Sequence, residues 1–474
     1  MIFSTVSFSI FFILLMIILI LIQLCCKNRI SQYSKISHVV LLIASYIYCG
    51  WYNVIFAVLL AVMSAITFIC AITYEHSGRK LFVHIGVIVP LIILGIFKYS
   101  NFFISAINTF GLDFNTINLI LPLGISFYTF QAIGYIIDVY RKNIKAEHSV
   151  LTFALYMAFF PKLLAGPIVR SADFLPQIRN GRRISLRGIS AGMQIFLFGL
   201  MKKVVLADHL SVFVNDVFNN PAEFSWFSIV LAVISYALQI YLDFSGYSDM
   251  AIGCAGMLGF DFKRNFNLPY LSHNVTEFWK RWHISLSEWF QQYLYIPLGG
   301  NRTTYIHMLA NLMTTMLLVG FWHGAAWTFV VWGGLHGMAV CMHKIFRKYY
   351  KNRNGNALGR GISILFTDVF VTLCWILFRA DTFGNAGQIL IRMMTLQSGV
   401  NELYTWTFIS ITAVAAATVC AVIRSGRRGE AQVNGFYPLL GMRKFSSMVI
   451  VAFEVLLIIG LAYTENNPFI YLQF

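Results

Sequence analysis

Charged residues are scarce in this sequence. They make up 11% of its 474 residues, far below the roughly 25% of an average soluble domain, and only 19 are acidic. Hydrophobic residues reach 58%, which excludes an ordinary soluble protein and predicts an all-α polytopic membrane protein. We find no internal repeat, low-complexity linker or soluble domain, so a single transmembrane domain over residues 1–474 is expected.

Cysteine motifs are missing as well. The eight cysteines mostly lie in apolar runs without a CxxC pair or metal-ligand spacing, so we interpret them as small hydrophobic residues and predict no metal site. The net charge of +16 would suggest nucleic acid in a soluble domain. Here the cations cluster in loops between apolar runs, a pattern typical of cytoplasmic loops. We therefore expect the lipid bilayer, and no nucleic acid, as the surroundings of the chain.

Apolar runs predict about 11–12 membrane helices, grouped as N-terminal helices (1–140), a catalytic core (150–343) and C-terminal helices (362–474). The first run precedes basic residues and lacks a small-residue cleavage site, so we expect a retained helix with the N-terminus outside. The alternation of basic loops places the C-terminus outside too. The runs are 5–26, 38–50, 53–73, 82–98, 118–140, 189–206, 226–258, 308–321, 325–343, 362–378, 404–423 and 446–463.

Two stretches depart from this pattern. Residues 150–165 are apolar but lead into another basic segment, so a re-entrant element is expected, which is tolerated where it lines a cavity or is buried in protein. Residues 259–307 are aromatic, basic and too polar to span, which suits a helix lying in the membrane interface. With the spanning helices, these elements are expected to surround a central tunnel.

Three histidines are candidate chemical groups. His323 lies within an apolar span, where an ionisable side chain is costly and is therefore a functional candidate. His283 lies in a helix-like basic stretch at the membrane surface. For His323 the alternative is a histidine bonded to a backbone carbonyl between packed helices. For His283 the alternative is an interfacial histidine beside tryptophans. His336 follows His323 by 13 residues and would point about 220° away on one continuous helix, so it is a secondary candidate.

Four charged residues in or beside apolar runs are further candidates. Asp243 and Asp249 are six residues apart, so they would lie on different faces of a helix. They mark either a helix break, with the backbone satisfied by neighbouring serines, or the polar lining of a tunnel. Lys162 and Arg170 are either ordinary surface cations or contacts for an anionic substrate.

Several long strings, in this order, resemble the membrane-bound O-acyltransferase family, and within it the bacterial branch that O-acetylates alginate or peptidoglycan. The resemblance covers most of the chain, and its specificity lies in the combination, since WHG alone is a weak motif. The strings are FPKLLAGPIVRSADFLPQI (160–178), QIYLDFSGYSDMAIG (239–253), NFNLPYLSHNVTEFWKRWHISLSEWFQQYLYIPLGGNR (265–302) and the WHGAAW box.

The resemblance implies an O-acyltransferase of the bacterial cytoplasmic membrane. It would move an acyl group, in the simplest case acetyl, from a cytosolic thioester to a hydroxyl of a cell-wall or exported polysaccharide. A secreted or membrane-anchored acetyltransferase partner is often involved. Acyl-CoA or an acyl carrier protein would be the donor substrate, and no bound cofactor is expected.

Within that reaction we assign His323 as general base, because histidine titrates near working pH and burial favours its neutral form. His283 would position the hydroxyl or stabilise charge. Trp322 and Trp282, which precede these histidines, are expected to line the tunnel. A serine or cysteine nucleophile stays open as an alternative, but direct transfer, or a relay through Tyr471, is the simpler scheme.

The C-terminal string TENNPFIYLQF has no lysine or arginine. It resembles an F-x-Y-x-x-F terminus found with bacterial members of the family, in which the tyrosine is proposed to carry the acyl group. Tyr471 would be that relay residue here; the alternative is an aromatic anchor at the outer interface.

Three other functions stay open at this point. A lyso-lipid acyltransferase is disfavoured by the polysaccharide-type strings. A D-alanyl transferase for teichoic acid would use a carrier-protein donor. A polysaccharide or lipid transporter without covalent chemistry would equally hold charged residues at membrane depth.

Overall fold

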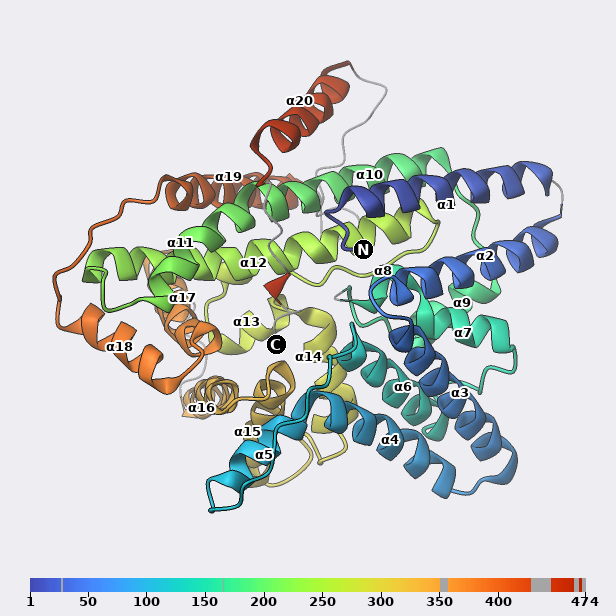
Figure 1. Ribbon diagram of the computed structural model, residues 1–474, viewed down its shortest axis with the longest axis horizontal. Coiled ribbons are helices and arrows are strands. Elements are labelled where there is room, and N and C mark those ends of the chain that lie inside the picture. Colours follow the sequence, from blue (N-terminus) through green and yellow to red (C-terminus); the bar gives the residue numbers. More distant parts are fainter. Residues whose placement is uncertain (27–28, 165, 350–356, 428–444, 464–468, 471–474) are drawn as a thin grey trace. The chain divides into compact units, whose positions relative to one another are not determined.

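The described part of the chain is helical. The computed structural model describes all residues except 27–28, 165, 350–356, 428–444, 464–468 and 471–474 (Figure 1). Within these residues the one extended pairing is an isolated bridge between Phe224 and Val400. The predicted all-α class is therefore confirmed.

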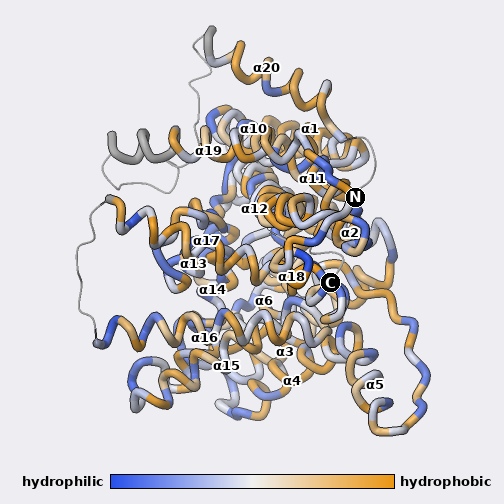
Figure 2. Tube along the Cα trace, turned by 90° about the vertical axis from the view of Figure 1, so that its left-hand side faces the viewer, coloured by the Kyte–Doolittle hydropathy of each residue, from blue (hydrophilic) through white to orange (hydrophobic). Residues whose placement is uncertain are grey.

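Eight helices of the described residues are long and apolar enough to cross a membrane, and two shorter apolar helices, 405–419 and 447–461, follow them. The first helix shows the membrane pattern clearly, because Ile10 and Ile13 are 56% and 58% exposed. Figure 2 shows the same hydrophobic character along the last helix. A polytopic membrane protein is thus confirmed, while the larger number of about 11–12 spans stays a prediction.

The chain divides into two compact units. The first comprises Met1–Phe196 and Met250–Lys263. Its elements are α1 (Val6–Cys25), α2 (Ile30–Gly50), α3 (Val54–Ser77), α4 (Leu81–Leu94), η1 (Gly95–Tyr99), α5 (Ser100–Asn108), α6 (Ile125–Tyr140), α7 (Val150–Ala158), α8 (Phe160–Leu163), α9 (Ser171–Arg179) and most of α10 (Leu186–Met201).

The second unit comprises Leu197–Asp249 and Arg264–Phe474. Its elements are η2 (Lys202–Ala207), α11 (Asp208–Asn219), most of α12 (Trp226–Met257), η3 (Pro269–Leu271), α13 (Val275–Arg281), α14 (Ile284–Phe290), η4 (Gln291–Tyr295), α15 (Tyr305–His323), α16 (Trp327–Tyr349), α17 (Ala357–Arg379), α18 (Phe383–Met394), α19 (Thr405–Arg427) and α20 (Phe445–Leu461).

In the first unit, helices α3, α4, α6 and α7 pack on one another. The apolar stretch 150–165 is interrupted there: α7 ends at Ala158, and the single turn α8 follows. Phe159 and Phe160 at this break are fully buried. A broken apolar element enclosed by protein is what the re-entrant interpretation requires.

Helix α12 is continuous over 32 residues. The interpretation of Asp243 and Asp249 as a helix break is therefore wrong. Both carboxylates are satisfied by lysine side chains instead of by a local change in the backbone. Helices α15 and α16 lie side by side in both views (Figures 1 and 2).

Candidate active site

Glycines allow the backbones of α15 and α16 to approach each other closely. A Cβ on Gly333 would lie 2.4 Å from the carbonyl oxygen of Met316, and a Cβ on Gly320 would lie 2.3 Å from that of Phe329. Small residues permit such contact between membrane helices. Gly324 between the helices is equally constrained, because its Cβ would overlap the Phe329 ring at 2.1 Å. The glycines therefore hold the WHG box in a tight hairpin.

His323 is the last residue of α15 and faces protein. Its side chain belongs to a residue only 3% exposed. The ring centroid lies 4.9 Å from that of Trp322, 5.2 Å from that of Trp332 and 5.3 Å from that of Phe378. The imidazole is thus set in an aromatic enclosure contributed by α15, α16 and α17.

His283 lies at a break between α13 and α14, and the expectation of a helix-like stretch is wrong at this residue. Its φ of 44° is left-handed, a conformation that is strained for a residue with a Cβ. The Asn265 oxygen accepts hydrogen bonds from the backbone N–H and the hydroxyl of Ser285, at 3.1 and 2.9 Å. It also lies 3.3 Å from His283 Nδ1. Because that oxygen accepts, Nδ1 donates, and the lone pair of the neutral ring resides on Nε2.

Burial determines the charge of His283. The residue is fully buried, and desolvation lowers its pKa from 6.5 to about 3. The phenyl ring of Phe244 lies edge-on with a centroid distance of 4.6 Å. His283 is therefore neutral near pH 7, which is the state that can accept a proton or a hydrogen bond.

One indole connects the two principal histidines. The Trp322 ring lies 6.2 Å from His283 and 4.9 Å from His323. Trp332, which also contacts His323, lies 4.8 Å from the ring of His336. His323 and His336 do not lie on one continuous helix, because the chain turns between α15 and α16. The angular separation expected for one helix therefore does not apply to them. All three histidines therefore share one aromatic cluster in the second unit.

The tryptophans of the basic stretch are buried in the second unit. Trp279, Trp282 and Trp289 are 8%, 0% and 9% exposed, and the stretch forms two short helices instead of one. The Trp279 N–H donates to His336 Nδ1 at 3.3 Å. These indoles pack against protein inside the unit, while the position of the stretch at the membrane interface stays a prediction.

The two aspartates of α12 each pair with a lysine of η2. Lys203 Nζ lies 2.8 Å from an oxygen of Asp243 and 2.8 Å from an oxygen of Asp208. Lys202 pairs with Asp249. All five residues of these ion pairs are buried, and Asp243 is 1% exposed.

Lys162 and Arg170 belong to the first unit. Lys162 is fully buried, so the interpretation as a surface cation is wrong. Its ammonium group donates to Gln131 at 2.8 Å and lies 4.1 Å from the centre of the Tyr156 ring. Desolvation lowers its pKa well below the usual value. Arg170 is the residue before α9 and is partly exposed. Tyr471 lies outside the described residues.

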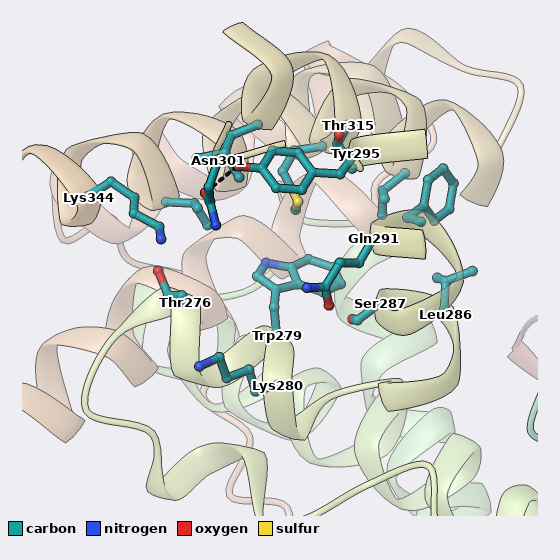
Figure 3. Close-up of a pocket in the computed structure, with 15 residues that line it drawn as sticks. Thr276, Trp279, Lys280, Leu286, Ser287, Gln291, Tyr295, Asn301, Thr315 and Lys344 are labelled. Carbon is teal, nitrogen blue, oxygen red and sulfur yellow. Dashed lines mark hydrogen bonds between the residues drawn. The ribbon is translucent and has the colours of Figure 1, made fainter. Parts of the chain in front are cut away.

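A cavity of about 230 Å³ opens between α13, α14, η4, α15 and α16 (Figure 3). Its fifteen lining residues include no histidine and are largely apolar, with Leu286, Met316 and Val319 among them. The ammonium groups of Lys280 and Lys344 lie toward the same side of the cavity in Figure 3. The cavity therefore combines an apolar body with a cationic side.

Sequence reasoning missed several residues that build this site. Asn265 is polar and unremarkable by position, so no sequence signal identifies it. Lys202 and Lys203 did carry a signal, because two adjacent cations interrupt an apolar run. Trp332 and Phe378 enclose His323 only after three helices come together, which local patterns do not reveal.

The fold and the buried histidine cluster define a polytopic helical membrane protein with a candidate transferase site. A model of the membrane-bound O-acyltransferase family matches residues 141–379, just over half of the chain. The chain belongs to this family, and it is therefore an O-acyltransferase.

Curated relatives narrow the comparison. The chain is 40% identical to a probable alginate O-acetylase of Pseudomonas aeruginosa over 73% of this chain and 68% of that protein. It is 36% identical to a probable alginate O-acetylase of Pseudomonas putida over 93% and 95%. It is also 36% identical to a peptidoglycan O-acetyltransferase of Helicobacter pylori over 75% and 73%. The transporter alternative is therefore wrong, because the relatives are O-acetyltransferases.

Proposed function

We propose that this enzyme moves an acetyl group from a cytosolic thioester to a hydroxyl of an extracytoplasmic polysaccharide of the cell wall or an exported polymer. The relatives named above are described as acting on alginate or peptidoglycan, which supports a polysaccharide acceptor. The bacterial cytoplasmic membrane, with both chain ends outside, is the location that the basic loops support. A secreted or membrane-anchored acetyltransferase is the expected partner.

The observation that carries this proposal is the pair of buried histidines connected through Trp322. In the proposed step the hydroxyl oxygen attacks the thioester carbonyl carbon, and a C–O bond forms while the C–S bond breaks. His323 takes the hydroxyl proton and returns it to the departing thiolate. His283 is neutral at working pH, so its Nε2 is suited to orient the attacking hydroxyl.

The cavity beside the histidine cluster supports a thioester donor. Its volume of about 230 Å³ is below the roughly 300–1,000 Å³ of typical small-molecule sites, so it suits a slender pantetheine arm better than a nucleotide. Lys280 and Lys344 would attract the phosphate at the end of such an arm. This chemistry is shared by acyl-CoA and an acyl carrier protein, so the proposal includes both donors.

Replacing His323 tests the base. We expect His323→Ala to lower acetyl transfer roughly 10²- to 10⁴-fold, the usual contribution of general acid–base catalysis. His307→Ala is a matched control, because His307 is an exposed histidine on the same helix. The measurement is the O-acetyl content of the polymer in cells expressing each variant at equal level. Unchanged O-acetylation with His323→Ala would remove the assignment.

The same assay distinguishes acetyl transfer from the remaining alternative, D-alanyl transfer to teichoic acid. Mild base releases acetate from an O-acetylated polymer and D-alanine from an alanylated one. Release of D-alanine that depends on this gene would favour the D-alanyl transferase with a carrier-protein donor. The Tyr471 relay is tested by Tyr471→Phe: a relay requires that transfer be abolished while donor binding is retained, whereas full activity would reduce the terminus to an anchor.

A further inference from the structure

Three buried charged groups form a compact cluster in the second unit. The Lys203 ammonium group bridges a carboxylate oxygen of Asp208 and one of Asp243, each at 2.8 Å. The side chains of these residues are 3%, 8% and 2% exposed. Two carboxylates facing one ammonium leave an excess negative charge, and a buried charge is stable only where further donors satisfy it.

A backbone N–H near the end of the chain provides one such hydrogen-bond donor. The second oxygen of Asp243 accepts the backbone N–H of Ile470 at 2.8 Å, across 227 residues of sequence. A hydrogen bond to an ionised carboxylate is about twice as strong as one between neutral groups. The carboxylate of Asp243 is thus shared between a fixed lysine and the C-terminal segment.

Aromatic packing holds the same segment. Phe469 is fully buried and stacks on Tyr247 with a centroid distance of 4.6 Å and an interplanar angle of 26°. Before this point the chain is already attached to η2, because the N–H of Tyr463 donates to the carbonyl of Val204 at 2.9 Å. The second unit therefore binds the end of the chain at two places, Tyr463 and the pair Phe469 and Ile470.

The seated segment lies beside the candidate active site. Phe244 contacts Phe469 at a centroid distance of 5.8 Å and His283 at 4.6 Å. The Phe244 ring therefore lies in contact with both Phe469 and His283, one of the two principal histidines. A segment that served only as an outer membrane anchor would not require a buried carboxylate inside the protein.

We propose that Asp243, held by Lys203 and Asp208, is a positioning residue that docks the C-terminal segment of the chain next to the histidine cluster. The docked residues Phe469 and Ile470 are the first two of the FIYLQF string, so the cluster sets where that string begins. The positioning role in transfer rests on the proposed function; the docking itself does not.

Hydrogen exchange measures the docking without any acyl transfer. In the full-length protein, Asp243→Leu should speed exchange of the Ile470 amide roughly ten- to a hundredfold, because a charge-assisted hydrogen bond is lost. Phe469→Ala leaves the ion cluster intact and should speed the same exchange, so it covers the case in which the Asp243 variant fails to fold. The peptide containing residues 469–470 is followed by mass spectrometry.

A control variant removes an ion pair of a buried carboxylate elsewhere. Glu147 is 6% exposed and pairs with Arg179 in the first unit, so Glu147→Gln should leave exchange of the C-terminal peptide unchanged. Wild-type exchange rates at Ile470 in folded Asp243→Leu, or in Phe469→Ala, would overturn the docking.

A kinetic arm tests the positioning. Phe469→Ala should lower kcat at least tenfold with little change in the KM for the thioester donor, and Phe469→Leu should restore part of the rate. An unchanged kcat alongside faster exchange would overturn the positioning role alone. Absence of acetyl transfer by the wild type would contradict the proposed function, whereas the exchange result would still decide the docking.

Discussion

Replacing Gly333 by alanine tests whether the close packing of α15 and α16 sets the geometry of the histidine cluster. The new Cβ would lie 2.4 Å from the Met316 oxygen and 3.0 Å from Gly320 Cα. Both atoms belong to helix backbone, so neither can rotate away. Since Cβ contacts below 3.0 Å essentially never occur, the helices must separate by about 0.6 Å or more.

This separation should affect both stability and rate. Overpacking of this kind costs about 1–3 kcal/mol of unfolding free energy. His323 on α15 and Trp332 on α16 would move apart, and a displacement approaching 1 Å at a catalytic group lowers the rate by up to about a hundredfold. We therefore expect Gly333→Ala to lower the melting temperature by roughly a few degrees and acetyl transfer by about ten- to a hundredfold.

The neighbouring glycine provides the control. A Cβ on Gly334 would meet only the end of the Leu317 side chain, at 3.4 Å, so Gly334→Ala should be close to wild type in both measurements. The assays are thermal unfolding of the purified protein in detergent and transfer from a thioester donor. If the Gly333 and Gly334 variants were equally stable and equally active, the packing argument would be refuted.

Two further predictions concern charge. The pKa of His283 is about 3 in the folded protein and 6.5 in the reference state. Between these values the unfolded chain binds one more proton than the folded chain, so stability falls as pH falls from about 6.5 towards 3. The melting temperature of His283→Gln should therefore fall less between pH 7 and pH 4.5 than that of wild type or His307→Gln, and an equal fall would contradict the assigned pKa. Lys280→Glu and Lys344→Glu should each raise the KM for the thioester donor roughly three- to tenfold, with a smaller effect at high salt. Lys348→Glu should leave this KM unchanged, because Lys348 lies on α16 but outside the cavity lining. An unchanged KM in all three variants would exclude the cavity as the donor site.

The membrane fold could be predicted from local patterns because each spanning helix satisfies its own backbone hydrogen bonds and is identified by its apolar length. The short amphipathic helix α18 was not predicted, since it is neither long nor uniformly apolar. The two principal histidines were also identifiable, because an imidazole within or beside an apolar run is conspicuous.

What the predictions missed involves partners distant in sequence. His283 looked helical, but Asn265 and the surrounding ring stacking hold it at a left-handed break. A surface cation was one of two interpretations of Lys162, but Gln131 and an aromatic ring from other helices bury it. A local pattern carries no information about which neighbour satisfies a polar group.

The sequence by itself determined that this chain enters a membrane as apolar helices, belongs to an acyltransferase family and carries histidines suited to proton transfer. Only the tertiary structure decided that His283 and His323 share the Trp322 ring, and that Asp243 binds a backbone N–H 227 residues away. The reason is that helix formation depends on neighbours along the chain, whereas the satisfaction of a buried charge depends on whichever group folding brings within hydrogen-bond distance.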